Sequence, residues 1–119
     1  MDIAKTRRST VETWASAWSE PDETRRLDLL GRAAAQTCAY CDPNTEVSGH
    51  ADISGYMRGF QDSVPGARFV TTGFWTHHDR CIVQWNMVDR EGNVLSPGVS
   101  AGVFDAQERL AQMTGFFDA

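Results

Sequence analysis

Tyr40-Cys41-Asp42-Pro43, followed by Val47-Ser48-Gly49, is the stretch of this 119-residue chain that decides its fold. It joins an N-terminal third with helical periodicity to a C-terminal half with strand periodicity. It also places a carboxylate, Asp42, directly before a rigid proline. A carboxylate at such a junction can face a cavity between helices and sheet, where burial makes it a usable proton acceptor. Asp before Pro is also a common turn-former that bonds its own backbone, so both interpretations of Asp42 stay open.

Two helices are predicted before this junction. The first covers residues 2–19, where apolar residues repeat with the spacing of one helix face, namely Val11, Trp14, Ala15 and Trp18. Residues 19–23 then stop that helix and start another, since Pro21 suits a first helical turn and the acids after it suit the positive end of the helix dipole. The second helix is expected to run to about Thr37.

After the junction, one more helix and then a series of strands are predicted. Short strands flank the Asp42 turn at 39–41 and 45–47, and the helix covers 49–63. The period then changes to two, which predicts strands over 67–76, 81–89, 94–104 and 109–117, with a bend at Ser96-Pro97-Gly98. This order predicts an α+β fold with the helices on one face of a curved sheet. By simple alternation, Trp85 and Met87 are expected on the apolar, pocket-side face of their strand.

Composition indicates one acidic domain, residues 1–119. The net charge of −5 argues against nucleic acid as a partner, because phosphate binding needs a basic field. No apolar run is long enough to span a membrane and the N-terminus carries no secretion signal, so no membrane partner and a cytoplasmic location are expected. Two arginine pairs, Arg7-Arg8 and Arg25-Arg26, are interpreted as solvated helix surface.

The cysteines and the paired histidines are expected to have no catalytic role. Cys38, Cys41 and Cys81 do not pair evenly, which favours reduced thiols, and the CxxC of residues 38–41 falls at the predicted C-terminal end of a helix, where no dipole lowers a thiol pKa. Neighbouring residues on a strand point to opposite sides, so His77 and His78 are interpreted as a solvated hairpin end. A metal site built from Cys38, Cys41 and His77 is a minor alternative, and the expectation is no metal and no cofactor.

Six short motifs follow one another along nearly the whole chain. They are Ala17-Trp18-Ser19-Glu20-Pro21-Asp22 after a Trp-rich helix, Tyr40-Cys41-Asp42-Pro43, Ser48-Gly49, Pro65-Gly66-Ala67-Arg68-Phe69, Gly98 to Phe104, and Gly115-Phe116-Phe117. In this order they resemble the nuclear transport factor 2-like superfamily, in its SnoaL-like branch, and are similar to the ketosteroid isomerases. The resemblance implies a cone-shaped fold, in which a strongly curved, mixed or antiparallel sheet encloses a pocket that the helices close. Many members dimerise through the sheet, so a homodimer of that kind is expected.

The resemblance also implies roles for single residues. Asp42 matches the general base of the ketosteroid isomerases. Their two oxyanion donors, a Tyr and a protonated Asp, align here with Trp14 and Ser100, whose indole N–H and hydroxyl can each donate a hydrogen bond. Asp42, Trp14 and Ser100 are therefore the predicted catalytic residues. The predicted ligand-binding residues are the other aromatic and apolar side chains expected in the pocket: Trp18, Tyr40, Tyr56, Phe60, Trp85, Met87 and Phe104. Core packing stays an alternative for the aromatics at helical spacing.

Two functions are consistent with these residues. The first is an enzyme of isomerase, cyclase or lyase type that acts on a small apolar carbonyl compound by carboxylate acid–base chemistry. The second is a non-catalytic module of the same fold, which binds a small ligand in the pocket or a partner on the sheet. The retained Asp42 favours the first, and the replaced oxyanion donors favour the second.

Overall fold

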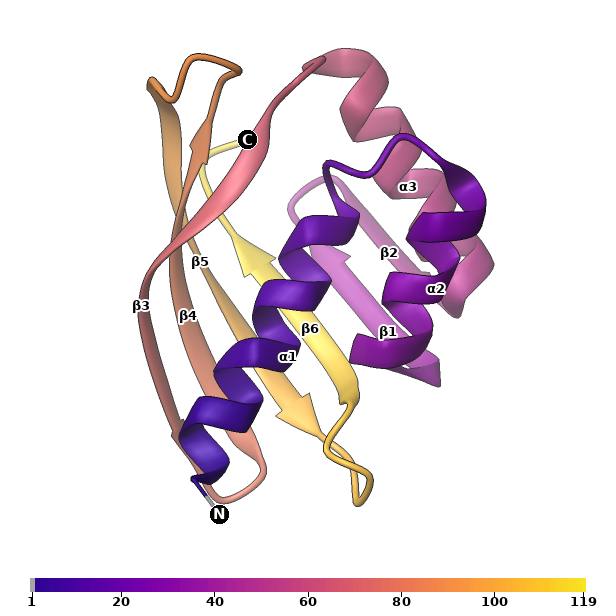
Figure 1. The fold of residues 1–119 in the computed structure, drawn as a ribbon, viewed down its shortest axis with the longest axis vertical. Coiled ribbons are helices and arrows are strands. Elements are labelled where there is room, and N and C mark those ends of the chain that lie inside the picture. The colour runs from indigo at the N-terminus through magenta and orange to yellow at the C-terminus, as the bar shows by residue number, and fades with distance from the viewer. Residues whose placement is uncertain (1) are drawn as a thin grey trace.

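The structure, a computed structural model, describes residues 2–119, which form three helices and a six-stranded sheet (Figure 1). The helices are α1 (Ile3–Ala17), α2 (Glu23–Ala33) and α3 (His50–Ser63). The strands are β1 (Ala34–Asp42), β2 (Thr45–Ser48), β3 (Arg68–His77), β4 (Arg80–Val88), β5 (Val94–Phe104) and β6 (Leu110–Phe116). The predicted α+β fold is confirmed.

The sheet is mixed, with strand order β2-β1-β6-β5-β4-β3. Only β1 and β6 run parallel to each other. Register shifts interrupt the pairing at several points, and such bulges bend and twist a strand. The predicted bend on β5 lies beside one of them, because Met87 pairs with Ser96 while the next residue, Val88, pairs with Val94.

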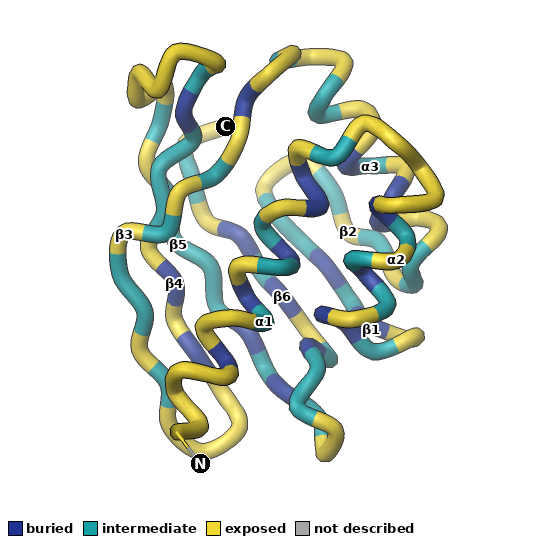
Figure 2. The backbone as a smooth tube through the Cα atoms, viewed as in Figure 1, coloured by how far each residue is buried: buried dark blue, intermediate teal, exposed yellow. Residues whose placement is uncertain are grey.

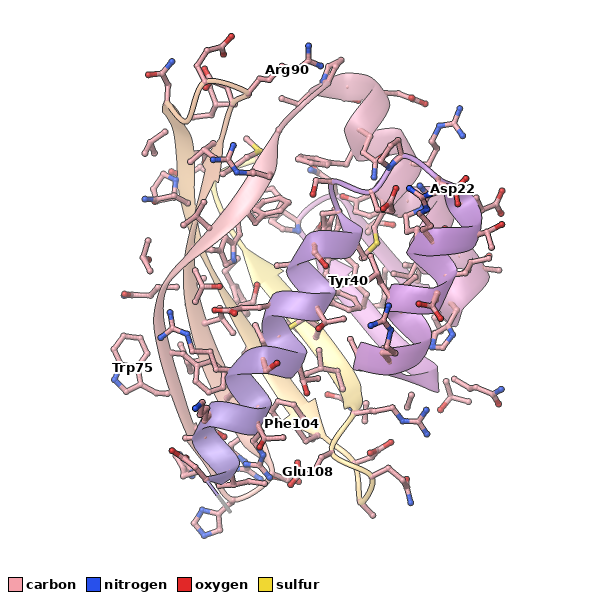
Figure 3. All side chains as sticks on the ribbon, in the orientation of Figure 1. Asp22, Tyr40, Trp75, Arg90, Phe104 and Glu108 are labelled. Carbon is pink, nitrogen blue, oxygen red and sulfur yellow. The ribbon has the colours of Figure 1, made fainter. Side chains whose placement is uncertain are left out.

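All three helices lie on the same face of this curved sheet (Figure 1). Helix α1 crosses in front of the sheet and packs against β3, while α2 and α3 lie toward β1 and β2. Buried residues concentrate between the helices and the sheet, as the dark segments of α1, β1 and β6 show in Figure 2. On β3, a bulge between Thr71 and Gly73 turns Phe74 toward the core and leaves Trp75 pointing outward (Figure 3).

The predicted boundary between α2 and β1 is wrong. Helix α2 ends at Ala33 instead of near Thr37, and the following residues are extended. The pairing of Ala34 with Leu110 on β6 overrides the helical propensity of this segment. Between Ala34 and Ala39 the β1–β6 register shifts, and there the His50 Nε2–H donates to the carbonyls of Ala34 and Ala35, each at 3.0 Å. The CxxC therefore lies on a strand instead of a helix end.

The interpretation of Arg25-Arg26 as solvated surface is wrong for one of its two members. Arg25 is exposed, whereas Arg26 is 1 % exposed. The Arg26 guanidinium donates to Ser54 Oγ and to the backbone carbonyl of Glu20, each at 2.8 Å, and so ties α2 to α3 and to the α1–α2 connection. Consecutive residues on a helix point in different directions, so only one of the pair can face inward.

The same correction applies to Arg7-Arg8. Arg8 is exposed, but Arg7 is buried against the far end of the sheet. Its guanidinium forms a two-point ion pair with Glu108, at 3.0 and 3.1 Å, and donates to Thr76 Oγ1 at 2.9 Å. It also lies over the ring of Phe104, 4.8 Å from the centroid. Figure 3 shows Phe104 and Glu108 at the end of the molecule where α1 begins.

None of the helices within residues 2–119 combines the length and the hydropathy that crossing a bilayer requires.

Candidate functional site

A cavity of about 350 Å³ lies between the helices and the concave face of the sheet. Its wall combines residues of α1 and α3 with residues of every strand except β2, together with the chain after β6. Aromatic side chains make up much of this wall: Trp14, Trp18, Tyr40, Tyr56, Phe60, Phe69, Trp85 and Phe117. Such a mostly apolar cavity with few polar groups is typical of a small-molecule site.

Asp42 lines this cavity at the end of β1, where it is half-buried. Its Oδ2 accepts hydrogen bonds from the Tyr40 hydroxyl at 2.6 Å and from the Tyr56 hydroxyl at 2.9 Å. Its Oδ1 accepts from the backbone N–H of Asn44 at 2.8 Å. Asp42 is therefore both a turn-former and a cavity residue, and its carboxylate has three hydrogen-bond donors.

The two tyrosines that hold Asp42 stay protonated over a wide pH range. Burial, and then the hydrogen bond to Asp42, raises the pKa of Tyr56 to about 12. The same two causes, burial first, raise the pKa of the Tyr40 hydroxyl still further above its usual range. Both hydroxyls therefore remain donors to the carboxylate.

We expect stability to fall at alkaline pH because of this raised tyrosine pKa. Between the ordinary value of 10.0 and about 12, the unfolded chain loses the Tyr56 proton while the folded protein keeps it, so the free energy of unfolding decreases as pH rises through that window. In a Tyr40→Phe background, Tyr56 is the only tyrosine, and its ultraviolet absorbance reports its titration. Adding Asp42→Asn should move that titration to lower pH, and an unchanged titration would contradict the arrangement.

Ser100 presents a hydroxyl to the cavity from β5. Its oxygen accepts a hydrogen bond from Trp85 Nε1 at 3.0 Å. Among residues 2–119, no acceptor takes the proton of the Ser100 hydroxyl, so that proton is available to a molecule in the cavity. The Trp85 ring lies over Gly98, where the Cβ of any other residue would overlap the indole. The predicted pocket-side orientation of Trp85 and Met87 is confirmed, since both line the cavity.

The tryptophans of α1 and of its C-cap are core residues and cavity residues at once. Trp14 and Trp18 are 5 % and 6 % exposed, and both line the cavity. Trp18 packs edge-on against Tyr40 and Tyr56, with ring centroids 5.4 and 5.8 Å apart. Neither indole N–H has a hydrogen-bond partner among the described residues. Every fully buried side-chain nitrogen or oxygen of these residues does have a partner, so the two N–H groups are not fully buried. We infer that both N–H groups are open to the cavity.

The cavity brings together all but one of the residues singled out from the sequence. Those that line it are Asp42, Trp14, Ser100, Trp18, Tyr40, Tyr56, Phe60, Trp85 and Met87. Phe104 does not: it is buried at the end of β5 beneath the Arg7 guanidinium, since β5 extends past the cavity into the core. The catalytic and binding roles of the residues that do line the cavity stay predictions.

Sequence reasoning missed several cavity residues. Phe69 and Thr71 lie on β3 with the alternation that placed Trp85 correctly on β4, so the same pattern could have found them. The last strand is predicted to end at Phe117 but ends at Phe116, so Phe117 and Asp118 follow it, where strand periodicity does not apply. They reach the cavity only because β6 ends beside it.

The histidines at the β3–β4 turn lie outside this cavity. Their Nδ1 atoms are 2.9 Å apart, contrary to the expectation that they point to opposite sides, because His78 is in a turn with a φ of 51°. Residues 2–119 contain no group of three His, Cys, Asp or Glu side chains that could hold a metal ion, so Cys38, Cys41 and His77 do not come together. Burial raises the pKa of the Cys38 and Cys81 thiols to about 11, and all three cysteines are free.

Comparison with solved structures shows that this arrangement is similar to those of SnoaL-like and nuclear transport factor 2-like proteins. A candidate isomerase of the SnoaL-like family from Agrobacterium tumefaciens aligns over 100 % of both chains with a TM-score of 0.87 and 27 % identity. A candidate SnoaL-like polyketide cyclase from Jannaschia sp. aligns over 99 % of this chain and 89 % of its own, with a TM-score of 0.79 and 16 % identity. The predicted family resemblance is confirmed.

A third similar structure contains a bound small molecule. It is a protein with a ketosteroid isomerase-like fold from Catenulispora acidiphila, in complex with trimethylamine. It aligns over 92 % of this chain and 85 % of its own, with a TM-score of 0.74 and 16 % identity, which shows a shared fold. No protein-family model matches the sequence, and no curated protein matches it.

Proposed function

We propose that the protein is an enzyme of isomerase or cyclase type that acts on a small apolar carbonyl compound in this cavity. The observation that carries the proposal is the placement of the Asp42 carboxylate in an aromatic cavity that Ser100 and Trp14 also line. Asp42 removes a proton from the carbon next to the carbonyl. Ser100 and Trp14 donate hydrogen bonds to the enolate oxygen that forms. Return of the proton from Asp42 to another carbon completes an isomerisation, and no cofactor takes part.

The comparisons support this reaction class but do not identify the substrate. Two proteins of similar structure are described as a candidate isomerase and a candidate polyketide cyclase of the SnoaL-like family. An isomerase or a cyclase that acts next to a carbonyl group can begin with removal of a proton from the neighbouring carbon. The fold itself carries many functions, so the proposal depends on the residues in the cavity.

Proton exchange at a ketone tests the proposal. The wild-type protein should accelerate deuterium incorporation next to the carbonyl of β-tetralone, followed by proton NMR. Ser100→Ala should slow this exchange by about 10²-fold, as expected for one lost oxyanion donor. Ser96→Ala is the matched control, because Ser96 also lines the cavity but its hydroxyl donates to the carbonyl of Pro97. Equal rates in the two variants would contradict the role of Ser100.

A non-catalytic binding function is the second candidate. The Asp42 carboxylate already accepts hydrogen bonds from two tyrosine hydroxyls and one backbone N–H, so taking a proton competes with these contacts. The trimethylamine complex of a protein with a similar fold supports a ligand-binding function. This candidate predicts that small molecules bind the cavity while no ketone undergoes exchange.

We also propose a homodimer formed through the convex face of the sheet. Trp75 and Ile82 pair across β3 and β4 with 57 % and 42 % exposure, and Phe116 is 54 % exposed on β6. Light scattering should give twice the chain mass of 13.2 kDa. Ile82→Lys should give the monomer mass, because it places a charge in the centre of an apolar contact. Val94→Lys, at a more exposed position at the start of β5, is the control and should leave the dimer intact.

A further inference from the structure

We propose that the ligand of this cavity carries a positively charged nitrogen, as a protonated or quaternary amine on an apolar body. The inference rests on the proposed function only in taking this cavity as the ligand site. It adds the chemical class of the ligand, which the fold and the candidate reaction leave open.

The charges around the cavity are of one sign. Its charged side chains are the carboxylates of Asp42 and Asp118, and none of its described lining residues is Lys, Arg or His. The whole chain carries a net charge of −5, which attracts cations toward such a site. A neutral carbonyl compound makes no use of this uniform negative potential.

Asp42 has donors but no counter-ion. The hydroxyls of Tyr40 and Tyr56 and the N–H of Asn44 provide hydrogen bonds to the carboxylate, but none of these donors carries a positive charge. A carboxylate in a largely apolar cavity is stabilised further by a partner of opposite charge. The free protein therefore holds a negative charge ready for a ligand cation.

Aromatic rings surround this carboxylate. Tyr40 and Tyr56 bond it directly, and their ring centroids are 5.9 Å apart. The ring centroids of Trp14 and Trp18 lie 5.7 and 5.4 Å from that of Tyr40. The negative faces of aromatic rings attract cations, with Trp the most effective, and desolvation strengthens the attraction. Aromatic rings around a carboxylate form the arrangement that recognises substituted ammonium groups.

This ligand class is compatible with the proposed reaction. The hydroxyl of Ser100 remains available for an oxygen acceptor on the same molecule. A cationic nitrogen withdraws electrons and makes a neighbouring C–H bond more acidic. One ligand can therefore carry a nitrogen that pairs with the cavity charge and a carbonyl that Ser100 contacts.

Two probes of the same shape and different charge test the inference. The cation meta-hydroxyphenyltrimethylammonium and the neutral meta-tert-butylphenol differ by the exchange of a nitrogen for a carbon. Calorimetric titration of the wild-type protein should give an affinity about tenfold higher for the cation. Asp42→Asn should reduce this preference to about twofold or less, since only the rings and the exposed carboxylate of Asp118 then remain. Glu46→Gln, which changes the net charge equally at an exposed β2 position outside the cavity, should keep the preference.

Each other outcome overturns the inference. Equal affinity for the two probes, or higher affinity for the neutral one, would contradict a cationic ligand. It would not contradict the proposed function on an apolar carbonyl compound. If Glu46→Gln loses the preference for the cation as much as Asp42→Asn does, the preference comes from the net charge of the protein and not from the cavity. Binding of neither probe also rejects it, and ketone exchange then decides the proposed function separately. Circular dichroism of each variant verifies that it is folded.

Discussion

Arg7→Ala should lower the free energy of unfolding by about 3 kcal/mol, the cost expected when one partner of a buried, hydrogen-bonded ion pair is removed. Arg7 joins α1 to the two hairpin ends of the sheet through Glu108, Thr76 and the carbonyl of His78. Its loss leaves the Glu108 carboxylate, whose side chain is 34 % exposed, without its cation, and it removes the contact with the Phe104 ring. Urea denaturation followed by tryptophan fluorescence measures the change.

The neighbouring arginine provides a matched control. Arg8 forms an exposed ion pair with Glu12 one helical turn away, and such pairs contribute about 0.5 kcal/mol or less. Arg8→Ala should therefore leave the denaturation midpoint almost unchanged. A similar loss of stability in both variants would mean that the Arg7 contacts do not hold α1 to the sheet.

Asp42→Asn should slow ketone proton exchange by about 10²- to 10⁴-fold relative to the wild-type protein, the range expected for loss of a general base. The substitution keeps the shape of the side chain and its acceptor for the Asn44 N–H, but it removes the group that takes the proton. The exchange rate of β-tetralone in deuterated buffer, measured by proton NMR at saturating ketone, reports the effect on the chemical step.

Affinity for the ketone, measured in the same samples, separates the two candidate functions. An enzyme should keep its affinity for a neutral ketone in Asp42→Asn while its exchange rate falls. If ketones bind both proteins and neither accelerates exchange, the binding function replaces the enzymatic one. Asp118→Asn, at the other carboxylate of the cavity, should retain most of the exchange, because that side chain is exposed and accepts no tyrosine hydrogen bond.

Much of the site could be predicted because strand alternation and helical spacing are local properties of the chain. The spacing of Trp14 and Trp18 placed both on the inner face of α1, and alternation on β4 placed Trp85 in the cavity. The hydrogen bonds from Tyr40 and Tyr56 to Asp42 could not be predicted in this way. Tyr56 lies on α3, and its hydroxyl reaches Asp42 only through the packing of that helix beside β1.

Phe104 and the end of α2 show where local patterns are insufficient. Phe104 has the alternation of a cavity residue, but β5 is long enough that its last residue lies beyond the cavity, in the core under Arg7. The segment from Ala34 to Thr37 has helical propensity, but pairing with β6 makes it extended. In both cases a contact with a distant part of the chain decides the outcome.

The sequence by itself determined the fold class, the order of the elements and the position of Asp42 at the junction between helices and sheet, because periodicity and turn chemistry act within a few residues. Only the tertiary structure decided the surroundings of that carboxylate: two tyrosine donors, tryptophan walls, and no cation among the described lining residues. It also decided which member of each arginine pair is buried. The physical reason is that burial and charge pairing depend on which distant segments the curved sheet brings together, and no local pattern records that.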